Sequence, residues 1–188
     1  MKKGLIFVIS APAGTGKTTL VRMLREEFPR VEESVSFTTR LPRSNERPGL
    51  DYHFITLQEF EKKIQAGEFL EYAKVFGHYY GTSRPLVDER TSLGKHIVLV
   101  IDTQGALQLM DQLNAVFIFL SPPSIDELKS RLRHRNEDSD AEIRLRLSWA
   151  EKEMKMASRY SYHIVNDNLK QAYDVLRSIF IAEEHKNR

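Results

Sequence analysis

Apolar runs of strand type alternate with helix-like patterns along most of this chain. The runs lie at residues 5–9, 97–101, 115–120 and 163–165, and apolar residues at helical spacing follow the first run from residue 17 onward. Strands that alternate with helices predict an α/β fold in which a parallel sheet is flanked by helices. The clearest helical stripe has apolar residues at i, i+3, i+4, i+7 and i+8: Ala172, Val175, Leu176, Ile179 and Phe180.

Two polar segments interrupt this alternation. Residues 36–83 are rich in arginine and aromatic residues and are numerous enough to form a small subdomain. Residues 124–160 follow a Pro-Pro pair and are charge-dense and helical. Because this second segment has little core of its own, we expect it to be mobile. The prediction is one domain over residues 1–188, with its core at 1–35, 84–123 and 161–188.

The link between the first strand and the first helix reads APAGTGKT. Small residues leave room for backbone N–H groups to reach phosphate oxygens, and a helix N-terminus favours an anion. Lys17 adds a positive charge for the β and γ phosphates, and Thr18 offers a hydroxyl to Mg²⁺. Ala11 replaces the usual first glycine, which is acceptable if its φ is negative. A glycine-rich turn is the alternative, but the flanking strand and helix favour an ATP-binding loop: Ala11, Pro12, Ala13, Gly14, Thr15, Gly16, Lys17, Thr18 and Thr19.

Composition narrows the class of function. With 188 residues, 41% of them hydrophobic, the chain can bury a core, but no run approaches the ~20 apolar residues that span a bilayer. No signal peptide is legible, so we expect a cytoplasmic protein. The absence of cysteine excludes disulfides and thiolate chemistry. A net charge of +2 gives no reason to expect nucleic acid as a partner, and the six histidines lack metal-ligand spacing.

Short motifs along the chain resemble those of one enzyme family. A serine stands at 36, T-T-R-x-P-R at 38–43, G-x-D-Y-x-F at 49–54, a glutamate at 71 and Y-Y-G-[ST] at 79–82. Further on come I-D-x-Q-G at 101–105, P-P-S at 122–124 and V-N-D at 165–167. Together these motifs closely resemble the guanylate kinases, a P-loop family of nucleoside monophosphate kinases. The resemblance implies that residues 36–83 are a GMP-binding insert and residues 124–160 a mobile lid.

The first insert offers groups for both ends of a nucleotide. Arg40 and Arg43 flank Pro42, which stiffens the loop and can aim both guanidinium forks at one phosphate, although a solvated basic loop is the alternative. Guanine presents two adjacent N–H donors that suit a carboxylate, and we choose Glu71, which by itself would be read as a surface glutamate. The resemblance implies that Thr82 donates to guanine O6. It also implies the GMP-binding set Ser36, Arg40, Arg43, Tyr52, Glu71, Tyr80, Thr82 and Asp102.

The second insert carries the arginines expected to close over the nucleotides. Arg131 and Arg135 lie one helical turn apart on the same face, so both can reach one ligand. The resemblance assigns both to the lid and places Arg146 near the transferring phosphoryl group. We expect Arg133 and Arg144 on solvated faces. The predicted catalytic set is Lys17, Arg40, Arg131, Arg135 and Arg146.

Other positions are ambiguous or depart from the family pattern. The resemblance places Asn166 near the adenine of ATP, whereas the isolated Asn-Asp pair predicts a turn or helix cap. Asp102 follows an apolar strand, as ligand-binding groups do in such sheets, or it caps the next helix. Val100 stands where the family commonly has an acid, which leaves Thr18 and the phosphates to hold Mg²⁺. Asn136 stands where a glycine is common, so the lid hinge is expected to differ.

The resulting hypothesis is transfer of the γ-phosphoryl group of Mg·ATP to GMP, and to dGMP, giving ADP and GDP. A phosphate monoester with a second pKa of about 6 is largely a dianion at neutral pH and can attack without a general base. Closure of both inserts after both nucleotides bind would exclude water. Two alternatives stay open: a noncatalytic guanylate-kinase-like module that binds phosphorylated proteins, and a kinase for another monophosphate. Lys17 and the lid arginines favour an enzyme.

Overall fold

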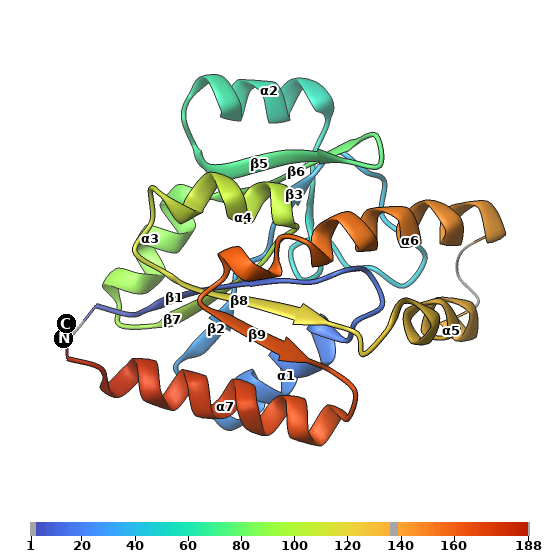
Figure 1. Ribbon diagram of the computed structural model, residues 1–188. Coiled ribbons are helices and arrows are strands. Elements are labelled where there is room, and N and C mark those ends of the chain that lie inside the picture. The colour runs from blue at the N-terminus through green and yellow to red at the C-terminus, as the bar shows by residue number, and fades with distance from the viewer. Residues whose placement is uncertain (1–2, 136–138, 188) are drawn as a thin grey trace.

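A central parallel sheet organises the computed structural model, which describes residues 3–135 and 139–187 (Figure 1). Its strand order is β2-β7-β1-β8-β9, and every neighbouring pair is parallel. The strands are β1 (Ile6–Ser10), β2 (Val31–Glu33), β7 (His96–Val100), β8 (Val116–Ser121) and β9 (Tyr162–Val165). The predicted parallel sheet is confirmed, and both ends of each of the four predicted strands lie within one residue of the observed ends. The edge strand β2 was not predicted, because its three residues Val-Glu-Glu carry too little apolar signal.

Helices cover both faces of this sheet and confirm the predicted α/β fold. Figure 1 shows α1 (Lys17–Glu27) and α7 (Leu169–His185) on one face, with α3 (Arg84–Ser92) and α4 (Thr103–Met110) on the other. Because side chains alternate along a strand, Phe7 and Ile9 join the core under α1 and α7, whereas Ile6 and Val8 join the other. The loop after β1 therefore starts from a strand that is buried on both sides.

The helical stripe of α7 is confirmed except at one position. Ala172, Leu176, Ile179 and Phe180 are buried, but Val175 is 47% exposed. Tyr173 is buried in its place, and its hydroxyl donates to the main-chain oxygen of Met23 in α1 and to Glu27. The apolar face of α7 is therefore rotated towards Tyr173.

A second, smaller sheet lies within the predicted insert 36–83. It has the order β4-β3-β6-β5, built from β3 (Phe37–Thr38), β4 (His53–Phe54), β5 (Phe69–Val75) and β6 (His78–Ser83), and it is covered by α2 (Leu57–Gln65). Phe60 of α2 stacks on Phe69 and Tyr79, with ring centroids 4.5 and 5.3 Å away. On its other side, β5 packs against α4, which ties this sheet to the central one.

The segment 124–160 holds α5 (Ile125–Arg135), α6 (Asp140–Met154) and the short 3-10 helix η1 (Ala157–Arg159). Leu128 and Leu132 of α5 pack against Ile143 and Ala150 of α6 in a small cluster separate from the two cores of the sheet. This agrees with the prediction of little core in this segment. Among the residues that the structure describes, none of the helices combines the length and apolar character of a membrane crossing.

Candidate active site

One cleft gathers residues from four parts of the chain. Its volume is about 610 Å³, and it lies among the loop after β1, the second sheet, the end of β7 and helix α6. Many of the predicted site residues line it: Ala11, Ala13, Lys17, Thr18, Ser36, Arg40, Arg43, Tyr52, Glu71, Tyr80, Asp102 and Arg146. Residues predicted from motifs far apart in the sequence therefore share a single cavity.

The loop after β1 has the open backbone that phosphate binding requires. Gly14 and Gly16 have φ values of 88° and 96°, which side chains rarely allow, whereas Ala11 avoids the positive φ region, as its replacement of glycine requires. Lys17 opens α1, and its ammonium donates to the main-chain oxygen of Ala11. Thr18 is exposed beside it. Among the described residues, no cluster of three or more His, Cys, Asp or Glu side chains could hold a metal ion.

Asn166 braces this loop from the far edge of the sheet. Its side-chain nitrogen donates to the main-chain oxygen of Thr15 at 2.7 Å, and its own main-chain oxygen accepts from Arg131 at 3.0 Å. It is buried, and a Cβ at Gly16 would lie 2.7 Å from its side-chain nitrogen. Asn168, not the Asn166–Asp167 pair, caps α7. Asn166 thus links the glycine loop to α5.

A buried carboxyl group, Glu71, and a partly buried one, Asp102, form one end of the cleft. Glu71 of β5 is only 4% exposed, and burial raises its pKa to about 7, helped by the nearby charge of Asp102. The hydroxyl of Thr82 donates to Glu71 Oε1 at 2.6 Å. Asp102 accepts from the backbone N–H of Gly105 at 2.9 Å as the N-cap of α4, and burial raises its pKa too. Asp102 is therefore both a helix cap and a wall of the cleft.

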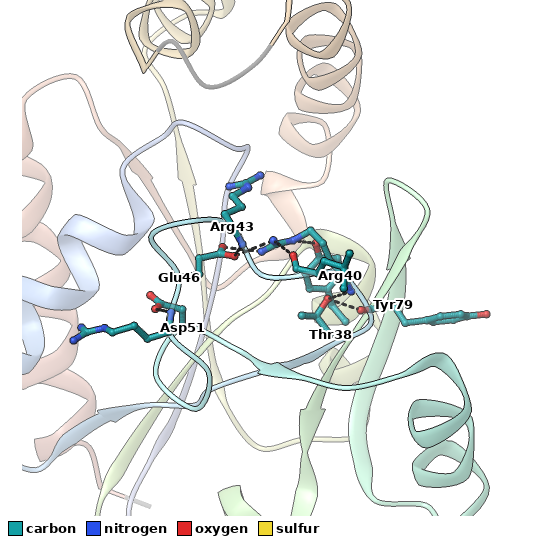
Figure 2. A network of polar contacts seen from close by, with 9 residues as sticks. Thr38, Arg40, Arg43, Glu46, Asp51 and Tyr79 are labelled. Carbon is teal, nitrogen blue, oxygen red and sulfur yellow. Dashed lines mark hydrogen bonds and ion pairs between the residues drawn. The ribbon is translucent and has the colours of Figure 1, made fainter.

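At the other end of the cleft, the cationic Arg40 is already paired with an acidic residue of the same loop. Arg40 makes a bidentate ion pair with Glu46, with nitrogen–oxygen distances of 2.9 and 2.7 Å (Figure 2). The Nε of Arg40 also donates to the hydroxyl of Tyr80 at 3.3 Å. The pair is largely buried, at 16% and 14% side-chain exposure, and the hydrogen bonds from Arg40 lower the pKa of Glu46. Figure 2 shows the Arg43 side chain pointing away from Glu46.

The lid arginines whose side chains the structure describes, Arg131 and Arg146, lie in different surroundings. Arg131 donates to Glu127 at 2.8 Å and to the oxygen of Asn166. Arg146 lines the cleft and lies over the ring of Phe76, 5.6 Å from its centroid. Arg135 ends α5, but its side chain lies outside the described part of the structure, as does Asn136. The remaining predictions concern Arg133 and Arg144, which are exposed as expected.

Three acidic residues that line the cleft, Glu46, Glu142 and Glu153, escaped the sequence analysis. Glu46 lies three positions after Arg43, where no pattern separates it from an ordinary loop residue. Glu153 lines the cleft from α6, where burial raises its pKa and the charge of Lys17 opposes that rise. The nearby Glu151 is exposed, and only the helix's orientation in the fold distinguishes the two.

A parallel sheet with an open glycine loop between its central strand and a helix defines a P-loop nucleotide-binding protein. The family model for guanylate kinase matches residues 3–183. The chain belongs to the guanylate kinase family.

Individual relatives agree with this assignment. The chain is 57% identical to a guanylate kinase of Protochlamydia amoebophila (strain UWE25), over 98% of this chain and 94% of the relative. It is 50% identical to a guanylate kinase of Chlamydia felis (strain Fe/C-56), over 97% of this chain and 90% of the relative. Its fold matches the crystal structure of guanylate kinase from Anaplasma phagocytophilum with a TM-score of 0.80 and 33% identity, covering 100% of this chain and 89% of that one.

Proposed function

We propose that this protein transfers the γ-phosphoryl group of ATP to GMP, giving ADP and GDP. One observation carries the proposal: the carboxyl groups of Glu71 and Asp102 share a cleft with Lys17 of the P-loop and with two arginines of the insert. The cleft therefore offers acceptors for a base, cations for a phosphate and a loop for a nucleoside triphosphate. By the same resemblance, dGMP is a second acceptor, and a cytoplasmic location stays part of the proposal.

Glu71 supplies the discrimination between purines. An ionised carboxylate accepts from the N1–H and N2–H₂ groups of guanine, and it repels the N1 lone pair of adenine. Asp102 and Ser36 lie at the same cleft and would complete the acceptor set. A buried carboxylate that lacks hydrogen-bond donors has an unfavourable desolvation free energy. A base without the two N–H donors of guanine does not offset it, so such a base binds more weakly. The recognition of guanine thus rests mainly on Glu71, which is already buried before the ligand arrives.

The reaction needs alignment more than acid–base chemistry. The GMP phosphate, held by Arg40, Arg43 and the hydroxyls of Tyr52 and Tyr80, attacks the γ-phosphorus of ATP in line while Lys17 balances charge on the β and γ phosphates. The hydroxyl of Thr18 would hold Mg²⁺, an ion that keeps waters and substrate phosphates among its ligands. When bound, Mg²⁺ supplies charge neutralisation across the β and γ phosphates.

The segment 124–160 is proposed as the lid that completes this site. Support comes from Arg146, which already lines the cleft, and from the separate small core that joins α5 to α6. Closure would bring Arg131, Arg135 and Arg146 to the transferring group and exclude water. Small-angle scattering with and without both nucleotides tests the closure: a smaller radius of gyration with both bound is expected, and unchanged profiles would contradict it.

The first test measures ADP formation from Mg·ATP with GMP, AMP, CMP, UMP and TMP in parallel. Turnover with GMP that far exceeds the others is expected. Lys17→Ala should abolish it, because the loop loses its charge for the phosphates. Turnover with another monophosphate would overturn the acceptor, and no turnover with any would favour a module that binds phosphorylated partners instead.

A further inference from the structure

The carboxylate of Glu71, which we assign to guanine recognition, fills the space left by the missing side chain of Gly105. This residue lies in the first turn of α4 and is buried, and it is absent from the described glycines with positive φ. Its backbone therefore tolerates any side chain, and the requirement for glycine is one of space. A Cβ built at this position would lie 2.9 Å from Glu71 Cδ and closer still to Oε2. The carboxylate of Glu71 thus occupies the volume that a side chain at 105 would take.

Other contacts fix how closely α4 approaches β5 at this point. The side chain of Gln108, one turn after Gly105, donates to the main-chain oxygen of Tyr72 at 2.8 Å and accepts from its N–H at 3.4 Å. Tyr72 directly follows Glu71. On the opposite side, Thr82 donates to Glu71 Oε1. The carboxylate therefore lies between a hydroxyl on β6 and the bare backbone of α4, with the cleft as its open side.

We propose that Gly105 is the positioning residue that determines guanine specificity in this protein: its missing side chain forms the seat that holds the Glu71 carboxylate against α4. The inference rests on the proposed function, because it concerns the same base-binding end of the cleft. Any larger residue at 105 forces the carboxylate outward into the volume that guanine would occupy. The glycine of the I-D-x-Q-G motif then has a steric reason, because the N-cap role of Asp102 uses only the backbone N–H of residue 105.

The physical argument separates recognition from folding. Alanine is a better helix former than glycine, so a methyl group at 105 favours α4 in the absence of a collision. The atoms that it meets are the end of a flexible side chain, which can move into the cleft at little cost to the fold. The same move shifts the acceptor oxygens by about 1 Å, enough to weaken two charge-assisted hydrogen bonds. Recognition is lost while the fold is kept.

The test is Gly105→Ala, measured by calorimetric titration with GMP and with ATP, by steady-state kinetics and by thermal unfolding. We expect GMP affinity to fall by about 30-fold or more, with the loss in KM rather than kcat. ATP affinity should stay within about twofold, and Tm should stay equal or rise. GMP affinity within about threefold of the unchanged protein would overturn the proposal.

A matched substitution calibrates the stability measurement. Gly81→Ala adds the same methyl group where a Cβ meets the rings of Phe60 and Phe69 at 3.0 Å, which are packed in the insert and cannot retreat. Its Tm should fall. An equal fall in Gly105→Ala would overturn the proposal, because the new methyl would then disrupt packing instead of moving Glu71.

A double variant shows whether the effect passes through Glu71. In a Glu71→Ala background the seat is empty, so adding Gly105→Ala should cause no further loss of GMP use. Losses that multiply would overturn the proposal. The unchanged protein separates this inference from the proposed function. If the unchanged protein does not phosphorylate GMP, the proposed function fails. If it does, and Gly105→Ala uses GMP equally well, only this inference is refuted.

Discussion

The two ends of the cleft that we assign to GMP differ in whether their acidic side chains are paired with a cation, and the pKa values of these side chains shift in opposite directions. At the base end, no cation of the described residues forms an ion pair with Glu71, and its pKa rises to about 7. At the phosphate end, Glu46 already pairs with Arg40, and the pKa of Glu46 is lowered. The base end therefore weakens the fold until a ligand supplies donors, whereas the phosphate end strengthens the fold and must share its cation with the ligand.

The largest expected effect comes from Glu71→Gln. The amide replaces one acceptor by a donor that faces the donors of guanine, so kcat/KM for GMP should fall by about 10³-fold. The KM for ATP should stay the same, because Glu71 is not assigned to the ATP side. Parallel kinetics with varied GMP and varied ATP measure both. Unchanged selectivity for GMP over AMP would remove Glu71 from the account of recognition.

Stability should change in opposite directions at the two ends. Glu71 has a folded pKa of about 7 against 4.5 as its ordinary value, so its burial weakens the fold increasingly as pH rises from about 4.5 to 7. Glu71→Gln should therefore stabilise the protein at pH 8, by up to about 3 kcal/mol, and should lose this advantage near pH 4.

Glu46→Gln should act with the other sign. The lowered pKa of Glu46 contributes stability above its unfolded pKa, and that contribution is lost as pH falls through the folded value. This variant should therefore lower Tm at pH 8. Thermal unfolding of both variants at pH 8 and pH 4 measures the contrast. Equal signs at pH 8 would show that the two ends do not differ as the geometry indicates.

The pH dependence of GMP use should report on the base end. Because only the ionised Glu71 accepts from both donors of guanine, KM for GMP should fall about fourfold as pH rises from 6.5 to 8 through the Glu71 pKa of about 7, and then level off. The phosphate of GMP has a second pKa of about 6, so the range from 6.5 to 8 isolates the protein group. Glu71→Gln should be flat in that range, and a matching slope in the variant would assign the titration elsewhere.

The sequence predicted the sheet and the loop better than the pairing inside the cleft. The order of apolar runs and the spacing of Gly16, Lys17 and Thr18 are local signals, and local signals are readable. The Arg40–Glu46 pair depends on how one irregular loop turns back on itself, which no periodic pattern reports. The burial of Glu71 against Gly105 depends on segments that only the fold brings together. The three-residue β2 was missed because so short a strand carries little periodic signal. Val175 was misplaced because helical spacing does not show where the edge of the buried stripe lies.

The phosphate end is expected to respond more mildly than the base end. In Glu46→Gln the guanidinium of Arg40 keeps its charge but loses one of the two oxygens that fix its plane. A guanidinium group that is already held in one plane loses less conformational entropy when it binds a phosphate. Because the variant loosens Arg40, KM for GMP should rise about tenfold while kcat changes less. Steady-state kinetics at pH 8 measure both constants. A lower KM would show instead that Glu46 competes with the phosphate for Arg40.

The smallest expected effect distinguishes two roles for Thr82. The resemblance implies donation to guanine O6, but the structure has Thr82 fully buried, with its hydroxyl on Glu71 Oε1 at 2.6 Å. This bond favours the ionised carboxylate, so Thr82→Val, which keeps the shape, should raise the pKa of Glu71 and raise KM for GMP about fivefold at pH 7. At pH 9 the carboxylate is ionised in both proteins and the difference should shrink. A fivefold rise in KM for GMP that persists at pH 9 would indicate instead that the Thr82 hydroxyl donates to guanine O6.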